Sequence, residues 1–164
     1  MIKITTYTLI GIISTIIIAF VFNHIFGVEL QSAALYFILP VGGLYVGIGG
    51  ASGLFYSYFQ NNKPITYRQY IFALLLAVIT FYGIYYASYL TSGNHLNTFQ
   101  QYLELQRSSG EVLIGIRGVV SPTGIPTGNV INTISFYLQL FGALLGSIGI
   151  GMYFHTTLDE KMGR

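Results

Sequence analysis

Four long segments of the chain are almost entirely apolar, and mostly polar stretches separate them. They run over about 4–26, 33–59, 67–90 and 132–154, and none has a charged residue in its middle. A helix needs about 20 mostly apolar residues to cross about 30 Å of hydrocarbon, and each segment is that long. The pattern predicts an all-α fold, an integral membrane four-helix bundle that forms a single domain over 1–164.

The connections between the first three segments are short, which predicts antiparallel hairpins. After the polar turn at 60–64, Thr66 and Gln69 have the spacing of a capping box, in which the threonine accepts from a free N–H and the glutamine reaches back. Pro40 lies inside the second segment. Because a proline removes a backbone donor and clashes with the preceding turn, we expect it to kink or break this helix.

The composition agrees with a surface that faces lipid. Of the 164 residues, 53% are hydrophobic and 7% are charged, whereas soluble domains carry roughly 25% charged residues. The net charge of +2 has no clustered basic face, which argues against a nucleic-acid partner. The chain has no cysteine, so disulfides and cysteine metal sites are excluded.

The basic residues indicate which ends of the spans lie inside the cell, because Lys and Arg favour the cytoplasmic side. With the N-terminus inside, five of them lie inside: Lys3, Lys63, Arg68, Lys161 and Arg164. Only Arg107 and Arg117 then lie outside. Both termini are therefore expected in the cytoplasm. Tyr and Phe mark both predicted interfaces, and the outer group includes Tyr85, Tyr86, Phe136 and Tyr137.

Small residues recur four positions apart in the second and fourth segments, as in membrane helices whose backbones approach closely. The second segment has Gly43, Gly47 and Ala51, and also Gly49, Gly53 and Ser57; the fourth has Gly142 and Gly146, and also Ala143, Ser147 and Gly151. The preferred interpretation is that these two helices pack on each other inside one bundle. The alternative is a dimerisation face or a moving helix. The first helix is bulkier, so a change at Gly11 should matter less.

A short echo between the same two segments suggests an internal repeat. The sequence Gly50-Ala51-Ser52-Gly53 resembles the run that begins at Gly146 and ends at Gly149. Because both segments run in the same direction in the predicted topology, a duplication is one interpretation of the echo. The match is short, and chance similarity between glycine-rich segments is the preferred one.

The long connection over 91–130 is expected on the outer side. Apolar residues at helical spacing, among them Phe99 and Leu103, predict a short amphipathic helix that begins near Asn94. Two placements stay open: the helix lies on the membrane surface, or it packs over the outer mouth of the bundle. Thr127 or Asn129 can cap the fourth helix.

Polar groups inside the spans are few. Asn132, Ser135 and Gln139 fall on one stripe of the fourth helix, which could line a narrow path in an oligomer, although interhelical hydrogen bonds are the preferred interpretation. On the outer side, His24 and His95 join Glu29, Glu104 and Glu111, without a metal-binding spacing. No catalytic residue, metal or cofactor is predicted.

Two glycine-rich stretches carry a resemblance to a known group of proteins. The second segment, with Leu39-Pro40-Val41-Gly42-Gly43 and Gly50-Ala51-Ser52-Gly53, resembles uncharacterised small bacterial four-span membrane proteins. So do Arg117 and the run that begins at Leu140 and ends at Gly146. The resemblance covers most of the chain. It implies a bacterial inner membrane, and it supplies no activity.

Taken together, these patterns favour a non-enzymatic membrane subunit or scaffold. It would contact membrane lipid, and a protein partner or a second copy, through its outer loop and its glycine-rich helices. A small oligomeric pore or transporter is the alternative, and a membrane enzyme ranks third.

Overall fold

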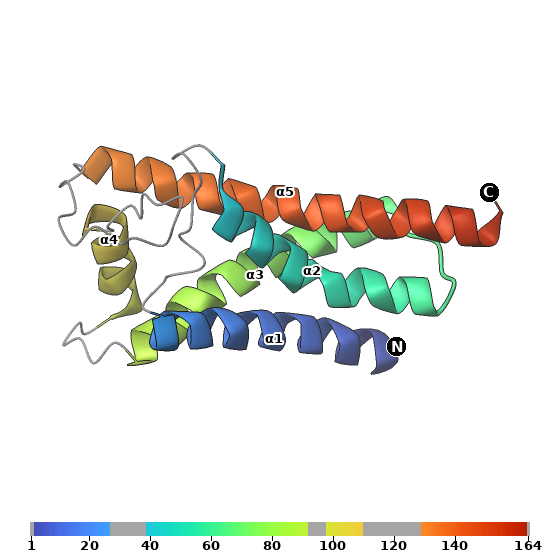
Figure 1. Ribbon diagram of the computed structural model, residues 1–164, viewed down its shortest axis with the longest axis horizontal. Coiled ribbons are helices and arrows are strands. Elements are labelled where there is room, and N and C mark those ends of the chain that lie inside the picture. The colour runs from blue at the N-terminus through green and yellow to red at the C-terminus, as the bar shows by residue number, and fades with distance from the viewer. Residues whose placement is uncertain (1, 27–38, 92–97, 110–128, 164) are drawn as a thin grey trace.

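The computed structural model describes residues 2–26, 39–91, 98–109 and 129–163. Within these ranges the chain forms five α-helices (Figure 1): α1 (Ile2–Phe26), α2 (Val41–Gln60), α3 (Tyr67–Thr91), α4 (Phe99–Ser109) and α5 (Asn129–Met162). The four long helices pack together, and α4 packs against α5 and α3 at one end. The prediction of an all-α fold is confirmed.

Three of these helices are long and apolar enough to cross a membrane. Their apolar stretches are Thr6–Ile25 in α1, Tyr67–Thr91 in α3 and Thr133–Met162 in α5. Each of the three exposes a row of large apolar side chains, for example Ile13, Leu75 and Phe141. These features indicate embedding in a membrane. In the described chain α2 is not among the three, although its 20 residues measure roughly 30 Å.

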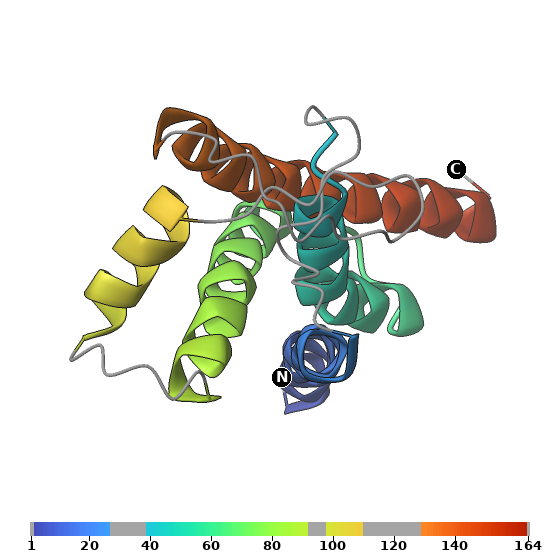
Figure 2. The same ribbon diagram turned by 60° about the vertical axis from the view of Figure 1, so that its left-hand side comes forward.

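The bundle has two different ends. The beginning of α1, the turn between α2 and α3, and the end of α5 lie at one of them, which we call the turn end (Figure 1). The helix α4 lies at the other, the α4 end. Figure 2 shows α2 between α1 and α5, with α3 beside it. Successive long helices are antiparallel, so α2 and α5 run in the same direction.

The helix α2 begins later than predicted. It starts at Val41, directly after Pro40 in the N-cap position, whereas the segment was expected to be helical from 33; residues 33–38 lie outside the described ranges. Proline is tolerated at a helix start, where no intrahelical donor is needed, and it disfavours helix in the residue before it. Pro40 therefore marks the start of α2 and does not lie within it.

The start of α2 is recessed within the bundle. Pro40 packs against Gly142, whereas α5 begins at Asn129. At 1.5 Å per residue, α2 therefore starts roughly 20 Å along α5. The beginning of α2 lies among its neighbours and not at the end of the bundle.

At the beginning of α3, the structure forms one of the two hydrogen bonds of the expected capping box, the one in which the glutamine side chain reaches back to the threonine N–H. The side-chain oxygen of Gln69 accepts from the Thr66 backbone N–H at 2.8 Å, and the Thr66 hydroxyl donates to the same oxygen. The Gln69 amide also donates to the Tyr58 hydroxyl at 3.0 Å. The cap therefore also ties the start of α3 to the end of α2.

The helix α5 extends well past the predicted limit at 154. Its last two turns carry polar residues such as His155 and Asp159, and it ends before Gly163. Gly163 has a φ of 67°, a left-handed conformation that glycine adopts at helix ends. Hydropathy indicated where the apolar stretch ends, but nothing in 155–162 stops a helix.

Candidate functional site: the crossing of α2 and α5

Two glycines of α2 let its backbone touch that of α5. A Cβ on Gly43 would overlap the backbone carbonyl of Gln139, and a Cβ on Gly47 would overlap that of Ala143. Without the glycines the two backbones could not approach this closely, which is the role of small residues in membrane helices.

The contact is reciprocal, because two glycines of α5 approach α2 in the same way. A Cβ on Gly142 would lie 2.7 Å from the side chain of Pro40, and a Cβ on Gly146 would overlap the carbonyl of Leu44. Gly43 thus corresponds to Gly142 and Gly47 to Gly146, and the two members of each pair are the same number of residues apart in the sequence. The crossing has a local two-fold relation between parallel helices.

The echo noted in the sequence does not follow this relation. Gly50 and Gly53 are buried inside the bundle, whereas Gly149 has no atom within 4 Å of a Cβ built on it. The residues that are equivalent at the crossing are the two glycine pairs above, in a different alignment of the two helices.

The other faces of α2 pack as closely on α1 and α3. Gly49 lies against the Thr15 side chain, Gly53 lies against the backbone of Tyr7, and a Cβ on Gly50 would lie 2.5 Å from the Thr80 hydroxyl oxygen. Small residues therefore face α2's neighbours on three sides. Half of its 20 residues are buried.

Gly11 of α1 belongs to this close packing, contrary to the bulky character expected of α1. It is buried, and a Cβ built on it would lie 3.1 Å from the Gly49 carbonyl oxygen and from the Gly53 nitrogen. The approach is looser than at Gly43 or Gly47, but it leaves no free space.

Gln139 joins the two helices of the crossing. Its side-chain oxygen accepts from the Gly43 backbone N–H at 2.7 Å, and the residue is 1% exposed. The first N–H groups of a helix have no partner within the helix, and the N-cap residue Pro40 makes no side-chain cap. A side chain of α5 therefore caps α2.

Of the predicted polar stripe, Gln139 does not lie at an outward face of the bundle. Ser135 is half-buried, and the side chain of Asn132 lies outside the part of the chain that the structure describes. Gln139 itself points at α2. In this arrangement its amide is used inside one bundle.

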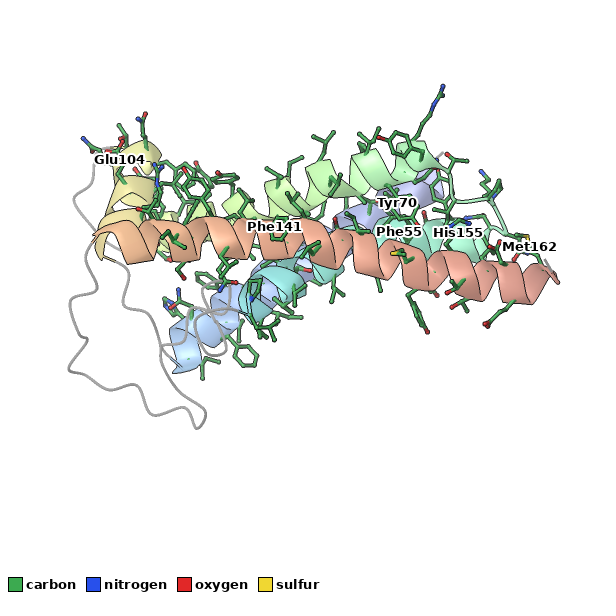
Figure 3. All side chains as sticks on the ribbon, turned by 90° about the horizontal axis from the view of Figure 1, so that it is seen from above. Phe55, Tyr70, Glu104, Phe141, His155 and Met162 are labelled. Atoms are coloured by element: carbon green, nitrogen blue, oxygen red, sulfur yellow. The ribbon has the colours of Figure 1, made fainter. Side chains whose placement is uncertain are left out.

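Gly151 forms a notch near the turn end, where two aromatic rings enter. A Cβ there would lie 2.6 Å from the Phe55 ring and 2.7 Å from the Tyr70 ring. The Tyr70 hydroxyl lies 3.5 Å from His155 Nδ1, and His155 Nε2 lies 3.5 Å from Asp159. Figure 3 shows Phe55, Tyr70 and His155 gathered in this region.

Aromatic rings fill the α4 end. Tyr85 of α3, Tyr102 of α4 and Phe136 of α5 are at most 7% exposed. The Arg107 guanidinium lies 5.9 Å from the centre of the Phe136 ring. Of the predicted outer belt, Tyr85 and Phe136 are therefore core residues. The helix α4 covers the bundle, which is one of the two placements left open.

The N-cap of α4 is Thr98, a residue that was not predicted for this role. The Gln101 N–H donates to the Thr98 hydroxyl at 3.3 Å, which makes Thr98 the N-cap. Asn94, the expected cap, lies outside the described ranges. A threonine three positions before a glutamine was the available signal.

The candidate metal residues are only partly described. His24 stacks on Phe20, with ring centres 5.1 Å apart. His95, Glu29 and Glu111 lie outside the described ranges. Among the residues that the structure does describe, no group of three or more His, Asp or Glu side chains could hold a metal ion.

Comparison with known proteins adds no assignment to this geometry. No protein-family model matches the chain, and neither a curated protein nor a solved structure matches it.

Proposed function

We propose that this chain is a non-enzymatic scaffold or subunit of a membrane assembly, built as a tightly packed bundle around α2. The observation that carries the proposal is the enclosure of α2. Its glycine faces are occupied by α1, α3 and α5 of the same chain, and Gln139 is bonded to Gly43. A partner would therefore bind the outward faces and not the glycine faces.

The same contacts disfavour a pore on the predicted stripe. A path for ions needs a polar lining or a constriction that can wet. Gln139 is the most polar candidate for such a lining, and it lies between α2 and α5 at 1% exposure. Opening a path beside it would require the two backbones to separate at Gly43 and Gly47.

We further propose that α2 makes a fourth crossing, in a bacterial inner membrane with both termini in the cytoplasm. Its length matches the hydrocarbon thickness, and its neighbours cover much of its surface, so it needs fewer lipid-facing side chains. The turn end carries Lys63, Arg68 and Lys161, which favours the cytoplasm for that end.

The outward surface offers two kinds of contact. Large apolar side chains on α1, α3 and α5 suit lipid or another membrane helix. At the α4 end, Gln100, Gln101 and Glu104 are exposed on the side of α4 away from the bundle. We propose that this polar face is where a protein partner would bind.

A flux measurement tests the scaffold proposal against the pore. The protein is reconstituted in liposomes, and ion and small-solute flux are measured beside empty liposomes and a Gln139→Leu variant. We expect the flux of empty liposomes in both cases. Flux from the native protein that is abolished by Gln139→Leu would overturn the proposal.

The orientation is tested by labelling single cysteines, since the chain has none of its own. In intact cells, a membrane-impermeant maleimide should label Thr91→Cys and Gln101→Cys. It should leave Gln60→Cys and Glu160→Cys unlabelled until the membrane is permeabilised. All four side chains are exposed in the bundle. Labelling at position 60 in intact cells would contradict the proposed topology.

A further inference from the structure

Two contacts fix the guanidinium of Arg107, which alone among the described lysines and arginines lies at the α4 end. Its Nε donates to the backbone carbonyl of Leu103, one turn earlier in α4, at 3.3 Å. The guanidinium carbon lies 5.9 Å from the centre of the Phe136 ring of α5, within the range of a cation–π contact. The side chain is therefore half-buried and held between α4 and α5.

The ring that supports Arg107 is itself fixed. Phe136 is buried, and the centre of its ring lies 5.5 Å from that of Phe81 and 5.4 Å from that of Tyr85, both on α3. On the other side, Tyr137 is exposed and lies edge-on to Phe136, with ring centres 5.6 Å apart. The guanidinium is therefore supported by the core, next to a part of α5 that faces lipid.

The terminal amino groups of Arg107 have no hydrogen-bond or ion-pair partner among the residues that the structure describes. The carboxylate of Glu104, one turn earlier in α4, accepts from the Gln100 amide at 3.4 Å instead. The terminal groups of an arginine form a planar fork that binds two oxygens of a phosphate or a carboxylate. This fork is therefore available to an anion.

The height of Arg107 along the bundle indicates where that anion comes from. The apolar stretch of α5 begins at Thr133, directly after Asn132, and Phe136 lies three residues farther, about 4.5 Å along the helix. Arg107 therefore lies near the boundary between hydrocarbon and headgroups, where long basic side chains extend toward the headgroups. Figure 1 shows α4 lying across the long axis of the bundle, the orientation of a helix at this boundary.

We propose that Arg107 binds the phosphate group of a membrane phospholipid at the α4 end. Its two terminal amino groups donate to two phosphate oxygens, and the acyl chains lie along α5 beside Tyr137. The depth of the site favours a lipid phosphate over a free phosphate or a carboxylate of a protein partner. The inference requires that the bundle is embedded in a membrane. It depends neither on the scaffold proposal nor on the orientation, because both leaflets contain phospholipid.

The test is the retention of phospholipid by the protein in a non-ionic detergent and a phosphate-free buffer, measured by native mass spectrometry. The probe is palmitoyl-oleoyl phosphatidylglycerol, and we expect the native protein to retain it. Arg107→Gln removes the fork and should weaken retention about tenfold. Arg107→Lys keeps the charge without the fork and should fall between the two. Arg68→Gln removes an exposed arginine at the turn end, and this matched control should retain the lipid as the native protein does.

Three further ligands identify the group that is recognised. Phosphatidylcholine with the same acyl chains should also depend on Arg107, because it carries the same phosphate. The corresponding diacylglycerol has no phosphate, and the native protein and Arg107→Gln should retain it equally and weakly. Inorganic phosphate at the concentration of the lipid should not displace phosphatidylglycerol. Circular dichroism checks the helix content of each variant, and Arg107→Met replaces Arg107→Gln if the latter does not fold.

Three results would overturn the proposal. Equal retention of phosphatidylglycerol by the native protein and by Arg107→Gln, or by Arg107→Met where that variant is used, would mean that Arg107 serves another partner, such as a protein carboxylate. Retention of diacylglycerol as strong as that of phosphatidylglycerol would mean that the acyl chains alone are bound. Displacement of the lipid by inorganic phosphate would assign the site to a free anion.

Discussion

Two helices of the same bundle, α1 and α2, have opposite surroundings. In the apolar stretch of α1 only 17% of the residues are buried inside the bundle, and Leu9, Ile13 and Ile17 are each about half exposed. In α2 half of the residues are buried, and five of those ten are glycines. One helix mainly faces lipid, whereas the other mainly faces protein.

The difference between α1 and α2 shows that high hydropathy marks a helix surface that faces lipid, whereas a high glycine content marks one that faces another helix. Large apolar side chains lower the cost of contact with lipid, so they accumulate where no protein covers the helix. Small residues let backbones meet, so they accumulate where protein does cover it. A helix in the centre of a small membrane bundle can therefore have a low mean hydropathy, because the small residues that let it pack closely are less hydrophobic than large apolar ones.

The side of α1 that faces α2 follows the same rule. Thr8 and Thr15 are buried there, and the Thr15 hydroxyl donates to the Gly11 carbonyl of its own helix at 2.7 Å. The Tyr45 hydroxyl of α2 donates to the Thr15 carbonyl at 3.3 Å. Even on the lipid-exposed helix, short polar side chains and glycine lie where the other backbone approaches.

The largest expected contrast is between a buried and a lipid-facing side chain. Phe55→Ala in α2 removes a ring that is 0% exposed, and it should lower the free energy of unfolding by about 3–5 kcal/mol through the cavity that it leaves. Ile17→Ala in α1 truncates a side chain that lipid can replace, and it should cost less than about 0.5 kcal/mol. Reversible unfolding in mixed micelles measures both. Equal losses would mean that α1 is as enclosed as α2.

A smaller contrast compares the two glycines at the crossing of α1 and α2. Gly53→Ala places a methyl group on the backbone of Tyr7 and should cost about 1–3 kcal/mol. Gly11→Ala meets its nearest atoms at 3.1 Å, so a shift of a few tenths of an ångström relieves it. Its cost should be about 1 kcal/mol or less. If Gly11→Ala proved the more damaging change in the same unfolding assay, α1 would be the tightly packed helix of this pair.

The sequence predicted the features that depend on local chemistry. The ranges of α1 and α3 lie within two residues of those expected, because apolar length and the Thr66–Gln69 cap are local signals. The sequence also showed the four-residue spacing between Gly43 and Gly47 and between Gly142 and Gly146. Those signals require no knowledge of the neighbouring helices.

Features that depend on a neighbouring helix could not be predicted. The spacing of the glycines did not say that Gly49 and Gly53 face α1, nor that Gly11 faces them. That the Gly43 N–H is the hydrogen-bond partner of Gln139 could not be predicted either, because it depends on where α2 begins. Pro40 can kink a helix or precede one, and only the packing distinguishes the two. Burial of Tyr85 and Phe136 likewise depends on the position of α4.

The central claim, that glycines of α2 are needed where a backbone crosses, is tested most directly by adding one methyl group at two places. Gly47→Ala collides with the Ala143 carbonyl, whereas Gly149→Ala on the open face of α5 meets nothing within 4 Å. The first should lower the free energy of unfolding by about 1–3 kcal/mol. The second should leave it unchanged or raise it by up to about 1 kcal/mol, because alanine favours helix over glycine. Effects of the same sign and size at both positions would contradict the account.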